Sequence, residues 1–324
     1  MALELIYTSA VRGVKPGTHG FCTVACSRNL PAPLAATLES LSGYRHLYPP
    51  ESENARFNPV VRSHLTIPFN GRPLHLLSRI AGAGLDYSKR TNKIAHHLAL
   101  GGGELVASGP AELFALPELF VESWTVEPTI FPTERTIPQG EKTAEICRHW
   151  EQMAGDAGWG GILAATALSG RSAGLILPPH FDPLPLLREA LALLSPADRW
   201  RVTFSTFFTK LPPGIECLWK CVAVDAPEEA HVRAVSKTLL IDLTRPLGSP
   251  EKLATDETAR RLMETARRGP ATVPTAQPVP TLRQTSVPVR QQPNEPNEPD
   301  AWDDDLFYSE IHYCPIRNPV KMGF

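Results

Sequence analysis

Polar and charged side chains gather between residues 78 and 100, on both sides of the glycine-rich stretch 82–84. We expect a turn at these glycines with a strand on each side, which would aim several polar side chains at one surface. Charged and aromatic groups brought together in this way suit a specific polar interface with another protein. The candidate binding residues are Arg79, Asp86, Tyr87, Arg90, Asn92, Lys93, His96 and His97.

A metal site is one alternative use of this segment. Adjacent residues point to opposite faces of a strand and diverge by about 100° on a helix, so His96 and His97 make a poor chelating pair by themselves. Further ligands would have to come from His64, His75, Asp86 or Cys22. Because metal coordination demands a defined geometry, the sequence favours no metal site.

An anion or nucleotide site is a second alternative, because glycines lie beside Arg79, Lys89 and Arg90. Backbone N–H groups and basic side chains can hold a phosphate. Neither residues 82–84 nor residues 101–103 match the glycine spacing of known phosphate-binding loops. A glycine-enabled turn with a solvated basic face is therefore favoured, with no catalytic residue and no cofactor.

Composition narrows the possible partners and locations. The 324 residues carry a net charge of −2, so the whole chain has no general attraction to nucleic acid or to an anionic membrane. No run of 18 apolar residues is present, and the first residues lack the pattern of a signal peptide. We therefore expect a cytoplasmic protein whose cysteines are mostly buried thiols.

The first half of the chain reads as strands with few helices. Asn70-Gly71 lies between two apolar runs and is the strongest hairpin signal in the chain. Residues 92–100 fit either a strand or a short helix, and the pattern leaves both open. The other expected elements are strands at 3–9 and 21–27, a helix at 31–41, hairpin strands at 60–67 and 74–80, and a short helix at 109–114.

A proline-bearing connection at 123–141 separates this half from a second block that mixes helices and strands. Expected there are helices at 143–157, 183–194 and 250–268, strands at 200–208, 216–224 and 239–243, tight turns at 158–161 and 169–172, and apolar segments at 162–168 and 174–177. The fold class is therefore α+β (mixed α/β), with two compact domains at 1–130 and 140–268.

Residues 269–324 have a different composition. Proline, glutamine, threonine and asparagine dominate at first, so this segment buries too little apolar surface to fold and is expected to be a disordered linker and tail. The final part holds aromatic residues beside Asp303, Asp304 and Asp305. It is either a partner-binding segment or the end of a truncated chain, and the composition does not separate these.

Several longer strings carry a family resemblance. They lie at residues 4–10, 17–25, 38–45, 58–61, 77–79 and 86–97. In these strings the chain resembles the bacterial GTPase-associated protein family of the first type, with the second subtype of N-terminal domain, over about residues 1–130. A middle domain of the same family is expected over about residues 140–245. The chain departs from the usually longer family members after Gly269.

The resemblance implies a protein without GTPase activity of its own, encoded beside a GTPase in bacterial conflict or signalling systems. No active site accompanies the family. We therefore expect a non-catalytic adaptor or scaffold that binds a GTPase or another protein of the same system through the candidate residues. The alternatives are a nucleotide- or metal-binding enzyme or sensor that uses the polar cluster from Arg79 to His97, and a cluster that only braces the fold.

Overall fold

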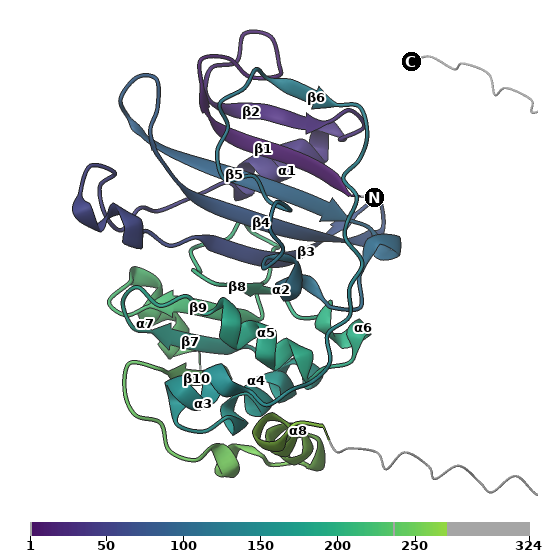
Figure 1. The fold of residues 1–324 in the computed structure, drawn as a ribbon, viewed down its shortest axis with the longest axis vertical. Helices are drawn as coiled ribbons and strands as arrows, with labels where there is room; N and C mark the ends of the chain where they lie inside the picture. Colours follow the sequence, from purple (N-terminus) through teal and green to yellow (C-terminus); the bar gives the residue numbers. More distant parts are fainter. Residues whose placement is uncertain (1, 236, 271–324) are drawn as a thin grey trace, which may run out of the picture. The chain divides into compact units, whose positions relative to one another are not determined.

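In the computed structural model, which describes residues 2–235 and 237–270, ten strands form one sheet in the order β10-β7-β9-β8-β3-β4-β5-β1-β2-β6 (Figure 1). Helices cover both faces of this sheet, so the predicted mixed α/β fold class is confirmed. The segment expected to be a disordered tail lies, from residue 271 on, outside the described residues.

The strands of the first half pair mainly in antiparallel fashion. Neighbours along β3-β4-β5-β1-β2 are all antiparallel, and the short strand β6 joins β2 in parallel within the expected connection. The strands are β1 (Leu3–Ala10), β2 (Gly20–Ser27), β3 (Val61–Phe69), β4 (Arg72–Leu85), β5 (Thr91–Leu100) and β6 (Thr129–Phe131). Residues 92–100, left open by the sequence, are thus a strand.

The hairpin predicted at Asn70-Gly71 is confirmed. Both residues have positive φ, 50° and 73°, as the two central positions of a type I′ turn require. The turn makes Phe69 face Arg72 and so fixes the whole β3–β4 register. This register decides which side chains of the hairpin share a face.

The turn expected at residues 82–84 is wrong, because these glycines lie inside β4. The register against β5 shifts between Gly82 and Leu85, which marks an irregular, bulged stretch of strand. Gly84 has φ +69°, and a side chain at Gly82 would lie 3.2 Å from His46 Nε2. Glycine is needed there for a bulge and a close approach, and the chain reverses over residues 86–90 instead.

The strands of the second half are parallel and shorter. They are β7 (Ala173–Leu177), β8 (Phe204–Ser205), β9 (Trp219–Ala223) and β10 (Leu239–Asp242). The strand expected over 200–208 is thus reduced to two residues. β8 pairs in parallel with β9 and antiparallel with β3, so it joins the two halves of the sheet.

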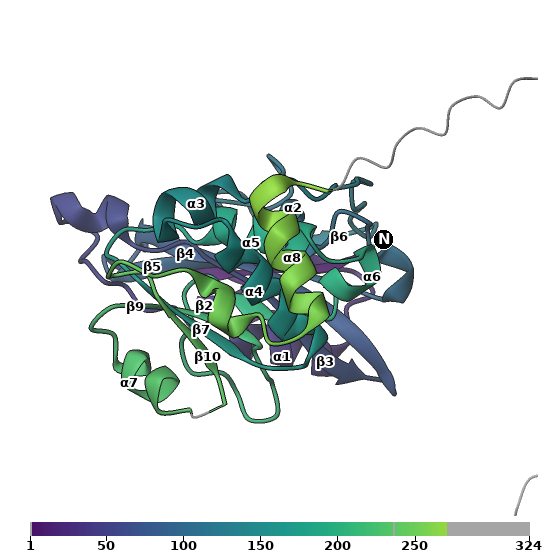
Figure 2. The same ribbon diagram turned by 90° about the horizontal axis from the view of Figure 1, so that it is seen from below.

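Two groups of helices cover the two faces (Figure 2). α2 (Pro110–Leu113), α3 (Arg148–Ala154), α4 (Gly158–Leu168), α5 (Leu184–Ala192) and α8 (Glu257–Arg268) belong to one core. α1 (Ala32–Leu41) and α7 (Pro227–Ala234) pack on the other face. The remaining helical elements are α6 (Pro196–Arg199) and the 3-10 turns at Glu53–Phe57, Gly102–Glu104 and Pro250–Leu253. None of the helices within the described residues is long and apolar enough to cross a membrane.

The glycine-rich residues 158–161, expected to form a tight turn, instead open helix α4. A side chain on Gly161 would lie 2.4 Å from the backbone nitrogen of Met263 in α8. A side chain on Gly160 would lie 2.8 Å from the Trp150 ring. The glycines therefore allow α4 to pack closely against α3 and α8. This requirement arises from tertiary contacts, which the local sequence does not reveal.

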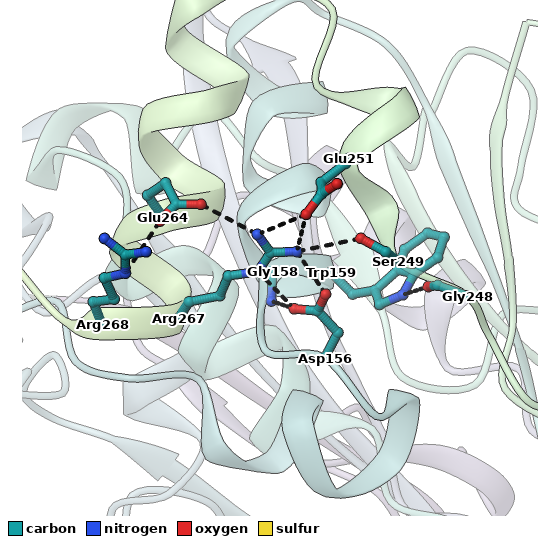
Figure 3. Close-up of polar contacts among 9 residues, drawn as sticks. All are labelled: Asp156, Gly158, Trp159, Gly248, Ser249, Glu251, Glu264, Arg267 and Arg268. Atoms are coloured by element: carbon teal, nitrogen blue, oxygen red, sulfur yellow. Dashed lines mark hydrogen bonds and ion pairs between the residues drawn. The ribbon is translucent and has the colours of Figure 1, made fainter.

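Arg267 fixes α8 to the start of α4 (Figure 3). Its guanidinium donates to both oxygens of Asp156, at 2.9 and 2.6 Å, and reaches Glu264 and Glu251 at 3.1 and 3.4 Å. Asp156 also accepts from the backbone N–H of Gly158 at 2.7 Å. The Arg267 hydrogen bond lowers the pKa of the Asp156 carboxyl, so the pair stays ionised near neutral pH.

We expect Gly161→Ala to lower the free energy of unfolding by about 2 kcal/mol or more, because backbone atoms of α8 block the added methyl group. Urea unfolding measures this change. Gly103→Ala is the matched control: no atom lies within 4 Å of its added carbon, and its effect stays within about 0.5 kcal/mol. Equal effects of the two variants would contradict the close packing of α4 on α8.

Candidate functional site

The eight candidate residues lie on and around β4 and β5, but they do not converge on one pocket. Arg79 faces His96 across the two strands, and both point to the face that carries Leu98. His97 and Lys93 point to the opposite face, because successive side chains of a strand alternate. The expectation that these side chains are aimed at one surface is wrong for this reason.

His97 is fully buried between α1 and the sheet. The Ser42 hydroxyl donates to the carbonyl of Leu38, so its oxygen accepts from His97 Nε2 at 2.9 Å. The Ser78 hydroxyl then donates to Nδ1 at 2.7 Å. Both ring nitrogens are thus satisfied inside the protein, and His97 ties the end of α1 to β4.

His96 is equally buried on the other face. The backbone N–H of Val121 donates to Nδ1 at 2.9 Å, which leaves Nε2 to donate to the Glu4 carboxylate at 3.1 Å. Arg135 stands 3.6 Å from the same carboxylate. Burial lowers the pKa of the imidazole although the Glu4 carboxylate opposes this, and the ring braces the 118–135 segment against the sheet.

Arg79 is largely buried beside this histidine. Its Nη2 donates to Glu122 at 2.9 Å, whereas Nη1 has no hydrogen-bond acceptor among residues 2–235 and 237–270. Burial lowers the pKa of the guanidinium. Arg79 therefore shares a face with His96 but presents little charge to the solvent.

Asp86 organises the reversal between β4 and β5. Its carboxylate accepts from the Ser88 and Arg90 backbone N–H groups at 2.8 and 2.9 Å and from the Ser9 hydroxyl at 2.8 Å. The Ser88 hydroxyl and the Arg90 guanidinium also donate to it. Burial by itself would raise the pKa of this carboxyl, but the hydrogen bonds hold it well below its usual range. The loop is thus fixed from inside by one charged group.

Asn92 fixes the start of β5 against β1. Its side-chain oxygen accepts from the backbone N–H groups of Ser9 and Lys93 at 3.1 and 2.8 Å, and it lies 3.2 Å from the Thr8 hydroxyl. The side chain is buried. Asp86 and Asn92 therefore hold the Ser9 region and the 86–90 loop together.

The exposed candidates Tyr87 and Arg90, together with His19, Phe21 and Ser88 from outside the group, form what we call the Tyr87 surface. These residues line an open concavity of ≈ 610 Å³ between the 15–20 loop and the 86–90 loop. Tyr87 is 51 % exposed and Phe21 42 %, and the Arg90 side chain is 63 % exposed. Lys93 Nζ reaches over β1, which lies between β5 and β2, to 5.2 Å from the centre of the Phe21 ring.

His64 and His75 were expected only as possible additional metal ligands, but they contact each other in the β3–β4 hairpin. His64 Nε2 and His75 Nδ1 are 3.0 Å apart, and His64 Nδ1 lies 2.7 Å from the carbonyl of Val202. The register set by the Asn70-Gly71 turn places Thr66 opposite His75, so His64 and His75 are diagonal neighbours on one face. The Asn70-Gly71 turn, which sets this register, can be recognised in the sequence, and it was the signal that could have indicated the histidine pair.

Residues 170–174 spell Gly-Arg-Ser-Ala-Gly, which is the spacing of a nucleophile elbow. An elbow needs a strand before the serine and a helix after it. Here Ser172 follows helix α4 and precedes strand β7, and its hydroxyl lies 2.8 Å from the Thr238 hydroxyl. The motif is a helix-to-strand turn, as expected for 169–172, and it provides no activated serine.

Comparison with known protein families shows to which family the chain is related. The model described as GTPase-associated protein 1, N-terminal domain type 2, matches residues 1–137, and that described as GTPase-associated protein 1, middle domain, matches residues 147–245. The chain belongs to the GTPase-associated protein 1 family. Searches of curated proteins and of solved structures found no match. The Tyr87 surface lies within the N-terminal domain of this family.

We expect the stability of the protein to fall as the pH drops below about 6.5. His64 and His97 are fully buried, and burial lowers the pKa of each to about 3. Below the unfolded value of about 6.5, the unfolded chain binds protons that the folded chain does not, at about 1.4 kcal/mol per pH unit for each histidine. Urea unfolding at a series of pH values measures the slope.

Two variants sharpen this measurement. His97→Gln keeps an amide for hydrogen bonding and removes one buried titrating group, so its slope is shallower. His19→Gln changes an exposed histidine and leaves the slope as in the parent protein. An unchanged slope in His97→Gln would contradict the neutral, buried state of this ring.

Proposed function

We propose that the chain is a non-catalytic adaptor of a bacterial GTPase-linked conflict or signalling system, which binds a partner protein through the Tyr87 surface. The family description, GTPase-associated, supports a GTPase of the same system as the partner. The observation that carries the choice of surface is the exposure of Tyr87, in the 86–90 loop, and of Phe21, at the start of β2, beside Arg90 at one concavity.

The residue types favour this role. Tyrosine and arginine are enriched among the residues that dominate binding energy in protein interfaces. A stable complex buries about 800 Å² on each partner, so the Tyr87 surface would form the centre of a larger contact. A half-exposed aromatic side chain leaves apolar area in water, and this area becomes buried when a partner covers it.

Rigidity of the 86–90 loop supports the same proposal. Asp86 already holds the backbone of residues 88 and 90, so a partner does not have to order this loop on binding. In this proposal Tyr87, Arg90 and Lys93 contact the partner. Asp86 and Asn92 hold the surface in shape, and Arg79, His96 and His97 brace the strands beneath it.

We expect Tyr87→Ala to weaken binding of the GTPase encoded in the same gene cluster by about 30-fold, a loss of about 2 kcal/mol. Isothermal titration calorimetry with the purified GTPase, loaded with GDP or with a GTP analogue, measures the affinity. Tyr87→Phe retains the apolar area and keeps most of the affinity. Circular dichroism confirms that each variant is folded.

Arg90→Ala provides a second test with a matched control. We expect a similar loss of affinity, because an arginine near the centre of an interface is costly to remove. Arg260→Ala removes an arginine of comparable exposure from α8, 57 % against 63 %, and leaves the affinity unchanged. Full binding by both Tyr87→Ala and Arg90→Ala would overturn the assignment of this surface.

A further inference from the structure

A groove lies where the sheet is interrupted. β3 has nine residues, but β8 pairs only with Ser63 and His64, so the rest of β3 has a strand partner on the β4 side alone. Beside this part of β3, a groove of ≈ 1360 Å³ lies between the end of the β3–β4 hairpin, the loop at 208–218 and α7. It is larger than the roughly 300–1,000 Å³ of a typical small-molecule site, so a small molecule would fill only part of it.

Hydrogen bonding fixes the proton positions of the two histidines at this groove. The carbonyl of Val202 can only accept, so His64 Nδ1 carries the proton and His64 Nε2 accepts. His75 Nδ1, 3.0 Å away, must therefore donate. A neutral His75 is left with an unprotonated Nε2. Burial lowers the pKa of both rings, so both are neutral near pH 7.

The unprotonated nitrogen is unused inside the protein. His75 is 9 % exposed and lines the groove, and its Nε2 has no hydrogen-bond partner among the described residues. This nitrogen opens into the groove, where a bound donor can replace solvent as its hydrogen-bond partner. The hydrogen bonds from the Val202 carbonyl through His64 to His75 thus leave His75 Nε2 as a hydrogen-bond acceptor for a ligand in the groove.

The remaining lining combines aromatic surface with positive charge. Trp200 and Phe208 contribute aromatic side chains, and Lys220 Nζ lies 5.6 Å from the Phe208 ring centre. Lys210 and Lys220 have no ion-pair partner within the described part of the chain. Glu216, one of two acidic residues that line the groove, also lacks an ion-pair partner there. Glu228, a second acid, is paired with Arg45 at 2.8 Å.

We propose that this groove binds a purine nucleotide, with an N–H of the base (the ring N1–H of guanine or the exocyclic amino group of either base) donating to His75 Nε2 and the phosphate held by Lys210 and Lys220. A flat base suits the aromatic lining, and a phosphate suits two lysines that lack an ion-pair partner among the described residues. The proposal is independent of the Tyr87 surface, because the two sets of residues have no member in common.

Nitrogen NMR of histidine-labelled protein tests the acceptor directly and needs no variant. In the absence of ligand, His75 shows a protonated Nδ1 and an unprotonated Nε2, and His64 shows the same tautomer. Addition of GDP or ADP moves the His75 Nε2 resonance as it accepts a hydrogen bond. A protonated Nε2 in the free protein, or no change with either nucleotide at millimolar concentration, would overturn the proposal.

Calorimetric titration with GDP and ADP tests the charges. Lys210→Ala and Lys220→Ala each weaken binding by about fivefold, and Glu216→Gln strengthens it, because one negative charge leaves the lining. Lys252→Ala, an exposed lysine outside the groove, leaves the affinity unchanged. Inorganic phosphate alone binds much more weakly than either nucleotide. Equal binding of phosphate and nucleotide would show that the base is not recognised and would refute the assignment.

Discussion

The two halves of the sheet are joined through β8, a strand of two residues. It pairs with β3 of the antiparallel half and with β9 of the parallel half. Additional bonds reinforce the junction: the Thr206 hydroxyl accepts from the Arg62 backbone N–H at 2.8 Å, and the Arg62 carbonyl accepts from the Thr206 backbone N–H at 2.9 Å. A change of strand direction is possible here because β8 satisfies an antiparallel neighbour on one side and a parallel one on the other.

Arg199 makes a second connection between the two halves, in the helical layer. Its buried guanidinium donates to the carbonyls of Leu191, Leu194, Ala192, Ala107 and Lys142, at 2.6 to 3.1 Å. A buried cation is tolerated when carbonyl oxygens surround it in this way. Ala107 lies in the segment matched by the N-terminal family domain, and α5 lies in the segment matched by the middle domain. The arginine therefore connects the two matched segments.

Much of the local structure was accessible from the sequence, and the reasons for the misses are physical. The Asn70-Gly71 signal is intrinsic to the turn, because two adjacent residues with positive φ favour these residue types. Glycines at 82–84 and 158–161 were misassigned because glycine also permits bulges and close helix contacts, which depend on partners distant in the sequence. Helix α8 begins at Glu257, where the Asp256 side chain accepts from the Ala259 backbone N–H, rather than at residue 250.

The candidate site shows what the alternation of side chains along a strand predicts and what it leaves undetermined. Alternation separates His96 from His97 and removes both from the solvent, since each face of β5 is covered. Exposure is a property of the covering layers, α1 on one face and the 114–135 segment on the other, and no local pattern encodes it. The side chains that remain available are those at the strand ends, where Asp86 closes the chain reversal and no helix covers it. Charge density along β4 and β5 therefore identified the strands, and only their packing separated the residues that can contact a partner from those that hold the strands in place.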